Sequence, residues 1–176
     1  MGGNLATASP AADGVAAIAA FETAIVVRSV RGQRRIPLDQ LQTGYKQSTR
    51  RTDEVIVAVE IVPPPPNVRW LWRKVGARRA QAISKVALAA WAELDGGRVA
   101  QFGAAAASVA PVTALMPRTR ALVSGSRLGS LAAHVVDEAV NADISPIDDL
   151  RSTRQYRAHC TRALVRTFLR DIDALR

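Results

Sequence analysis

The sequence predicts an α+β fold, with short strands and a helix in its first third and an antiparallel hairpin followed by helices in the rest. Three patterns lead to this prediction. Runs rich in valine and isoleucine alternate with turn residues before a run of four prolines. Two further apolar runs flank the turn signal Asp95-Gly96-Gly97. After Thr119, apolar residues recur at helical spacing.

The first helix is expected to begin at Ser9-Pro10, because serine caps a helix and proline suits its first position. Asp13 then falls in the first turn, where a carboxylate favours the helix dipole. The helix should end near Phe21. Its buried face is expected to consist of Val15, Ile18 and Ala19.

Three strands should follow this helix. Residues 23–30 and 34–38 predict a hairpin around the turn at 31–33, and residues 54–62 predict a third strand. Residues 38–45 between them are typical of a short helical turn and a loop. The prolines at 63–66 predict a stiff extended connector, because proline can continue neither a helix nor a central strand. We therefore predict one domain over residues 1–63 and a second over residues 64–176.

The second domain should begin with a strand over residues 68–75 and a loop over residues 77–82. Residues 83–94 are alanine-rich enough for a helix, yet the glycine turn behind them favours a long strand that returns over 99–110. Helices are expected over 126–140 and 149–175. The apolar stripe predicted for the last helix is Tyr156, Cys160, Leu164, Phe168 and Ile172.

The composition is that of a globular protein, with 176 residues, 48% hydrophobic and 22% charged. No apolar run reaches the roughly 18 residues that a membrane span requires, so we expect no membrane insertion. Cys160 is the only cysteine, which rules out a disulfide within the chain and fits a reducing compartment. We therefore expect a cytoplasmic protein.

The net charge of +9 raises the question of an anionic partner. Aromatic residues make up only 5% of the chain, so a platform for stacking single-stranded bases is poorly supplied. No zinc finger, basic zipper or helix-turn-helix pattern is present in the sequence. The sequence therefore favours a solvated basic surface over a nucleic-acid binding site.

Catalytic and metal-binding patterns are weak. The two histidines, His134 and His159, both fall in predicted helices without a nucleophile motif nearby. His159 and Cys160 are neighbours, so on a helix their side chains diverge by about 100°. The acidic stretch 143–149 resembles a metal cluster, but Ser-Pro and Asp before a long helix are more simply a cap region.

The N-terminal stretch GGNLATASPAAD, residues 2–13, is a candidate phosphate site. Adjacent glycines suit a tight turn whose consecutive N–H groups bind an anion. Ser9 and Asp13 follow at positions from which both side chains can address one ligand. A frayed tail is the alternative interpretation, since glycine-rich termini are commonly disordered.

Four blocks in order carry a family resemblance: residues 2–13, residues 34–64, RKVGARRAQAISKVALAAW at 73–91 with DGGRV at 95–99, and residues 145–169. The chain resembles the FAD-binding (medium) subunit of the molybdenum hydroxylases, the xanthine dehydrogenase and carbon monoxide dehydrogenase family. The resemblance covers the second FAD lobe and the C-terminal domain. It implies that the first lobe, with the family's other glycine-rich loop, would precede Met1. It also implies a three-stranded antiparallel sheet packed with helices in the second domain.

The resemblance implies a set of FAD contacts. Gly2, Gly3 and Asn4 match the turn that holds the pyrophosphate. Lys74 matches a lysine beside the isoalloxazine ring. The other implied contacts are Ser9 and Asp13 after the turn, Ile56 in the third strand and Ile83 in the loop beside the ring.

Structural interpretations of the same region stay open. Ile56 is also a plausible core residue of a strand, and Tyr45 is as plausible a structural tyrosine as a loop contact. Arg78 and Arg79 are either solvated or contacts for a nucleotide acceptor.

By resemblance, the whole enzyme passes electrons from a molybdopterin centre through 2Fe-2S clusters to FAD and then to an acceptor. The implied partners are a molybdopterin-binding large subunit and an iron–sulfur small subunit. The first FAD lobe is expected either from a separate chain or from an upstream extension of this one. The competing hypothesis is a non-catalytic docking module that has lost FAD binding.

Overall fold

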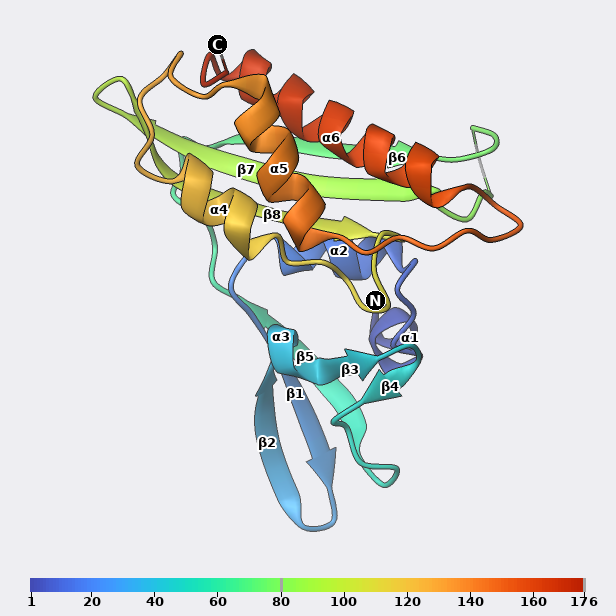
Figure 1. Ribbon diagram of the computed structural model, residues 1–176. Helices are drawn as coiled ribbons and strands as arrows, with labels where there is room; N and C mark the ends of the chain where they lie inside the picture. The colour runs from blue at the N-terminus through green and yellow to red at the C-terminus, as the bar shows by residue number, and fades with distance from the viewer. Residues whose placement is uncertain (80, 176) are drawn as a thin grey trace.

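The computed structural model describes residues 1–79 and 81–175, and it has an N-terminal lobe below a larger sheet-and-helix layer (Figure 1). The elements of the lobe are α1 (Gly2–Ala6), α2 (Asp13–Ala19), β1 (Thr23–Ser29), β2 (Gly32–Pro37), α3 (Leu38–Leu41), β3 (Gln42–Gly44), β4 (Gln47–Ser48) and β5 (Val55–Ile61). The layer contains β6 (Arg69–Val75), β7 (Val86–Asp95), β8 (Arg98–Ala107), α4 (Pro117–Val123), α5 (Ala133–Asp143) and α6 (Arg154–Asp171).

The lobe sheet has the order β2-β1-β5, and both pairs are antiparallel. The predicted hairpin and third strand are therefore confirmed. The inner face of β1 is buried through Ile25 and Val27, which face Ile36 of β2 and Ile56 of β5. A register shift at Val26/Val27 interrupts the pairing with β5.

The second sheet has the antiparallel order β6-β7-β8, which confirms the strand interpretation of the alanine-rich run. Gly96 and Gly97 both have positive φ, at 54° and 74°, as the tight turn between β7 and β8 requires. The strand begins at Val86 rather than at Ile83. Helices α4, α5 and α6 cover one face of the sheet, and α2 lies against the other (Figure 1).

The predicted start of the first helix is wrong, although its buried face is right. Helix α2 begins at Asp13, because the Ser9 hydroxyl accepts a hydrogen bond from Ala11 N at 3.3 Å in a turn and does not cap the helix. Asp13 still lies in the first turn. The three predicted inward side chains, Val15, Ile18 and Ala19, are all buried.

Two C-terminal predictions also need correction. Helix α5 begins at Ala133, because the preceding segment is a loop in which Gly129 has a φ of 70°. In α6, Tyr156 is 43% exposed and the helix ends before Ile172. The rest of the predicted stripe is confirmed, because Phe168 and Ile172 are buried in the core and Cys160 and Leu164 pack against it. The helix also buries Arg157, Thr161, Val165 and Leu169.

The acidic stretch serves helix ends, as the cap interpretation predicts. Asp143 accepts hydrogen bonds from Arg118 N and Thr119 N at the start of α4, at 3.0 and 2.8 Å. Asp148 accepts from Arg154 N at 2.6 Å, at the start of α6. Among the described residues, no three His, Cys, Asp or Glu side chains gather as a metal site would need. Nor does any helix in the described ranges have the length and apolar character to cross a bilayer.

One hydrophobic core cluster crosses the predicted domain boundary. It joins the lobe residues Leu5, Val15 and Ile25 to Trp91 and Ala105 of the second sheet. A smaller cluster consists of Ala16 of α2 with Ala87 and Ala107 of the sheet, all with no exposed surface. The division at residue 63 stays a prediction, since the two sheets are separate while α2 shares its core with both.

Trp91 and Gly103 make the tightest part of this junction. The Trp91 indole N–H donates to Ala20 O at 2.7 Å, just past the end of α2, and its ring stacks on Phe21 at a centroid distance of 6.1 Å. Gly103 faces Trp91 across β7 and β8. A Cβ at residue 103 would lie 2.7 Å from Trp91 Cε2 and closer still to Trp91 Nε1 and Ala20 O. Only glycine leaves room for the indole there.

We expect Gly103→Ala to lower the free energy of unfolding by about 2–4 kcal/mol, because the new methyl group displaces the indole and breaks its hydrogen bond. Urea denaturation followed by tryptophan fluorescence measures the change. Gly2→Ala is the matched control: a Cβ there meets nothing within 4 Å, and the free energy should change by less than about 1 kcal/mol. Equal effects of the two substitutions would contradict the packing argument.

Glu54 anchors the loop before β5 and is only 5% exposed. Its carboxylate accepts from Arg34 Nε at 2.7 Å, from Arg34 Nη2 at 2.9 Å and from Arg51 N at 2.7 Å. The hydrogen bonds from Arg34, with a further contribution from Arg51 N, lower the pKa of Glu54 from 4.5 to about 2.

A lowered carboxyl pKa stabilises the fold above the ordinary pKa, and the stabilisation is lost as pH falls through the folded-state pKa. We therefore expect the unfolding midpoint in urea to fall between pH 4.5 and about 2, and Glu54→Gln to flatten this part of the pH profile. Glu138→Gln, at an exposed position of α5, is the control and should keep the wild-type profile. A Glu54→Gln profile as steep as the wild type would refute the assignment.

Candidate functional site

Two residues predicted to address one ligand lie in contact although 61 positions separate them. Lys74 Nζ, from the edge strand β6, donates to Asp13 Oδ2 of α2 at 2.6 Å. The second carboxylate oxygen, Oδ1, accepts from the Ser84 hydroxyl. The side chains of Lys74 and Asp13 are 32% and 35% exposed, so the pair lies at the surface and is accessible to a ligand.

The expected tight turn at Gly2-Gly3-Asn4 is wrong, because these residues form the start of α1. Asn4 N and Leu5 N donate to Met1 O at 3.0 and 3.3 Å, and Leu5 is fully buried, which fixes the short helix on the core. Gly2 and Gly3 are not among the described glycines whose φ is positive. Both are exposed, and a Cβ at either would meet nothing within 4 Å.

Helix α1 nevertheless lies beside the start of α2. A Cβ at Gly14 would lie 3.2 Å from Met1 Sδ and 3.3 Å from Asn4 Nδ2. Asn4 is therefore close to the residue that follows Asp13. The first N–H groups of a helix have no acceptor within the helix. The backbone N–H groups of Gly2 and Gly3, at the start of α1, are therefore available to donate to a ligand.

The other predicted contacts are not brought into direct contact with this pair. The Ser9 hydroxyl is engaged in the turn that precedes α2. Ile56 is partly buried and packs on the lobe core, as the structural interpretation predicts. Ile83 is 55% exposed and directly precedes Ser84. In the same loop, Arg78 Nη2 donates to Gln81 O at 2.7 Å.

Three polar residues that the sequence did not single out support the pair from behind. Ser84 is 1% exposed, and its carbonyl accepts from Ser108 Oγ at 2.9 Å. Arg157 is 3% exposed and donates to Lys85 O at 2.8 Å and to Ser108 O at 2.9 Å. A serine at a strand entry and an arginine inside an amphipathic helix carry no distinctive sequence signal.

Arg157 also pairs with Asp149, at 2.6 Å. Burial of Asp149 works against its ionisation, yet the hydrogen bonds from Arg151 N, Ser152 N and Arg157 bring its pKa below the ordinary value. Asp149 is therefore the charge partner of a buried guanidinium. The pair ties the start of α6 to the segments that carry Ser84 and Ser108.

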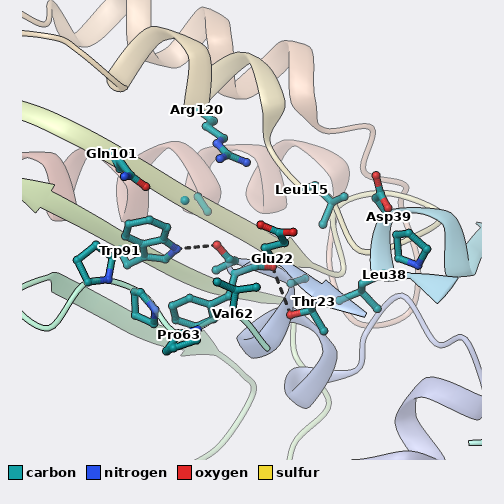
Figure 2. A pocket seen from close by; sticks show the side chains of 18 of the residues that line it. Glu22, Thr23, Leu38, Asp39, Val62, Pro63, Trp91, Gln101, Leu115 and Arg120 are labelled. Carbon is teal, nitrogen blue, oxygen red and sulfur yellow. Dashed lines mark hydrogen bonds between the residues drawn. The ribbon is translucent and has the colours of Figure 1, made fainter. Parts of the chain in front are cut away.

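A cavity of about 540 Å³ lies elsewhere, between the lobe and the second sheet (Figure 2). Its lining includes Glu22 and Asp39 from the lobe, Arg120 from α4 and Trp91 from β7. It contains none of the predicted site residues. Because β6 pairs Lys74 with Ala87, Trp91 lies four residues further along β7 from the Lys74 position. The cavity and the Asp13–Lys74 pair are separate features.

Comparison with known proteins identifies both parts of the chain. Residues 1–65 match the family model described as the FAD binding domain in molybdopterin dehydrogenase. Residues 72–172, more than half of the chain, match the model described as the CO dehydrogenase flavoprotein C-terminal domain.

Relatives agree with these matches. The chain is 24% identical over 174 residues to the xanthine dehydrogenase FAD-binding subunit of Escherichia coli O157:H7, covering 98% of this chain and 60% of that protein. It is 27% identical to the nicotine 6-hydroxylase medium subunit of Paenarthrobacter nicotinovorans, covering 99% of this chain and 60% of that protein. The chain thus spans about 60% of the length of these curated relatives.

The fold is similar to that of a carbon monoxide dehydrogenase chain from Hydrogenophaga pseudoflava, with a TM-score of 0.88 over 98% of this chain and 59% of that one, at 23% identity. At this identity the similarity concerns the fold. The two family matches show that the chain belongs to the family of FAD-binding flavoprotein subunits of molybdopterin dehydrogenases.

Proposed function

We propose that this chain forms one side of an FAD site in a molybdopterin-dependent oxidoreductase, with the flavin ring beside Lys74 and the pyrophosphate beside α1. The contact between Asp13 and Lys74 is the main support for this proposal. It joins the part of the chain that matches the FAD-binding model to the part that matches the flavoprotein C-terminal model.

The proposed phosphate end of the site fits an anion. Gly2 and Gly3 present main-chain N–H groups at the start of α1, and no Cβ blocks the approach of a bulky group. Asn4 adds an amide that is able to donate to a phosphate oxygen. Ser9 and Asp13 would supply the polar contacts that follow, with Asp13 accepting from a sugar or ribityl hydroxyl of FAD rather than facing a phosphate.

The proposed ring end combines a cation with exposed apolar surface. The Lys74 ammonium is partly exposed and carries a positive charge at the protein surface. Ile83 is 55% exposed, and its apolar side chain could be covered by the flavin ring. Ile56 is partly buried in the lobe core, so only a small part of its side chain would contact the cofactor. FAD, when bound, supplies a centre that accepts electrons and delivers them to an acceptor. With FAD bound beside it, the Lys74 ammonium would stabilise negative charge near N1 and the C2 carbonyl of the ring.

We also propose partners for the chain. Relatives that match it are named as a medium subunit or chain of a larger enzyme. A molybdopterin-binding large subunit and a 2Fe-2S small subunit would place this flavin between the clusters and an external acceptor. The first FAD lobe, supplied by another chain, is the third proposed partner. Exposed valines on the edge strand β5, Val55 at 66% and Val57 at 46%, are a surface that such a lobe would cover.

Two features bear on the remaining alternatives. The Asp13–Lys74 contact favours flavin binding over a docking module that has lost its site. A single cysteine in the whole chain supports the proposal of a cytoplasmic enzyme, because that compartment keeps thiols reduced.

The first test is flavin content. The full chain should retain acid-releasable FAD when it is co-purified with the segment of the Escherichia coli relative that it does not cover, and it should retain less alone. Asp13→Ala should lower the retained fraction severalfold, while Asp39→Ala, near the separate cavity, should leave it unchanged. Absence of flavin from both preparations would reject the proposal.

The second test is the flavin reduction potential. In flavin-loaded protein, Lys74→Met should make the potential more negative by about 20 mV, which corresponds to about 1 kcal/mol for two electrons. Lys74→Arg keeps the charge and should stay near the wild-type potential. Lys46→Met, at an exposed lysine of the lobe, is the matched control. A Lys74→Met potential equal to that of Lys46→Met would place the ring away from Lys74.

A further inference from the structure

Ser84 occupies an unusual position for a hydroxyl group, because it is buried directly behind a surface ion pair. Its side chain is 1% exposed, and its hydroxyl donates to Asp13 Oδ1. The other carboxylate oxygen, Oδ2, receives the Lys74 ammonium. The three residues come from α2, from the edge strand β6 and from the segment that enters β7.

The ion pair alone would hold Lys74 weakly. About a third of each side chain is exposed, and pairs of this kind are screened by water and opposed by side-chain entropy. Lysine adds a flexible four-carbon stem to this cost. The Ser84 hydroxyl fixes the Asp13 carboxylate through Oδ1, so Oδ2 points in a constant direction toward Lys74. The hydroxyl thereby supplies the fixed orientation that the ion pair alone does not have.

Ser84 is itself held by the rest of the fold. Its carbonyl accepts from Ser108 Oγ at 2.9 Å, and Ser108 N donates to Pro10 O at 2.7 Å, three residues before Asp13. The buried Arg157 of α6 donates to the carbonyls of Ser108 and Lys85. Hydrogen bonds therefore run from α6 to Lys85, the residue after Ser84, and through Ser108 to the carbonyl of Ser84, so that the backbone at Ser84 is held in place.

We infer that Ser84 is a positioning residue: through Asp13 it fixes the Lys74 ammonium at the place where the flavin ring is proposed to lie. The identity of the group facing Lys74 rests on the proposed function, whereas the positioning itself requires no flavin. In this arrangement Asp13 acts mainly by orienting Lys74, and its remaining lone pairs stay available to a ligand hydroxyl.

Lysine-selective NMR on the flavin-free full chain tests the positioning. The chain has only three lysines, so three ammonium signals are assigned by single Lys→Arg variants. Lys46 and Lys85 each lie over a tyrosine ring, at 5.5 and 5.3 Å from its centroid, and serve as internal references. The Lys74 ammonium should exchange with water more slowly than that of Lys46. Ser84→Ala should speed its exchange about fivefold, the factor expected for one net hydrogen bond.

Matched variants make the result decisive. Asp13→Asn should speed Lys74 exchange at least as much as Ser84→Ala does. Ser126→Ala removes a part-buried hydroxyl that bonds to Val123 O, and it should leave all three lysines unchanged. Ser84→Cys keeps the volume of the side chain but donates only weakly, and it gives the same acceleration if the alanine variant does not fold. Unchanged Lys74 exchange in a folded Ser84 variant would overturn the inference.

Flavin-loaded protein separates this inference from the proposed function. The potential of Ser84→Ala should shift in the same direction as that of Lys74→Met and by a smaller amount. Protein that binds FAD but shows neither a potential shift nor faster Lys74 exchange in the Ser84 variant would overturn the inference alone. Protein that binds no FAD, yet loses Lys74 protection in Ser84→Ala, would support the positioning role and reject the flavin site.

Discussion

The close packing of α2 on the second sheet is the constraint on which the rest of the molecule depends. Ala16 faces Ala87 and Ala107 with no exposed surface, and the small side chains let helix and strands approach closely. Larger residues at these positions would lift the helix and carry Asp13 away from Lys74. The alanines of β7 and β8 therefore set the distance between α2 and the sheet, and with it the distance between Asp13 and Lys74. Gly103, which pairs with Trp91, also lacks a side chain that would crowd the indole.

Local patterns in the sequence predicted most of the secondary structure because they reflect local physics. The glycines at 96–97 require positive φ, and this requirement decided between strand and helix for residues 83–94. Boundaries were less predictable. Ser9 had two possible uses, as a cap or in a turn, and in the structure its hydroxyl accepts from Ala11 N in a turn before α2. On α6 the predicted apolar stripe failed only at Tyr156, and the charged residue beside it, Arg157, is buried with hydrogen bonds to two carbonyls.

The site was predictable only where a family resemblance covered it. Asp13 and Lys74 were placed on one ligand by resemblance, and their contact follows from three-dimensional packing that no spacing rule reveals. The resemblance also predicted a glycine turn at Gly2 and Gly3, where the structure has a helix that begins because Leu5 is drawn into the core. Ser84 was missed since a single hydroxyl between a loop and a strand looks like any other polar residue.

The core that α2 shares with the second sheet limits where the chain can be separated into two folded parts. The proline run from Pro63 to Pro66 connects two separate sheets, so it is the place where the strand connections favour a division. A genetic exchange or a protease cut at that place would still leave α2 resting on alanines that belong to the other segment. A division of the chain at the prolines would therefore separate α2 from part of its packing surface.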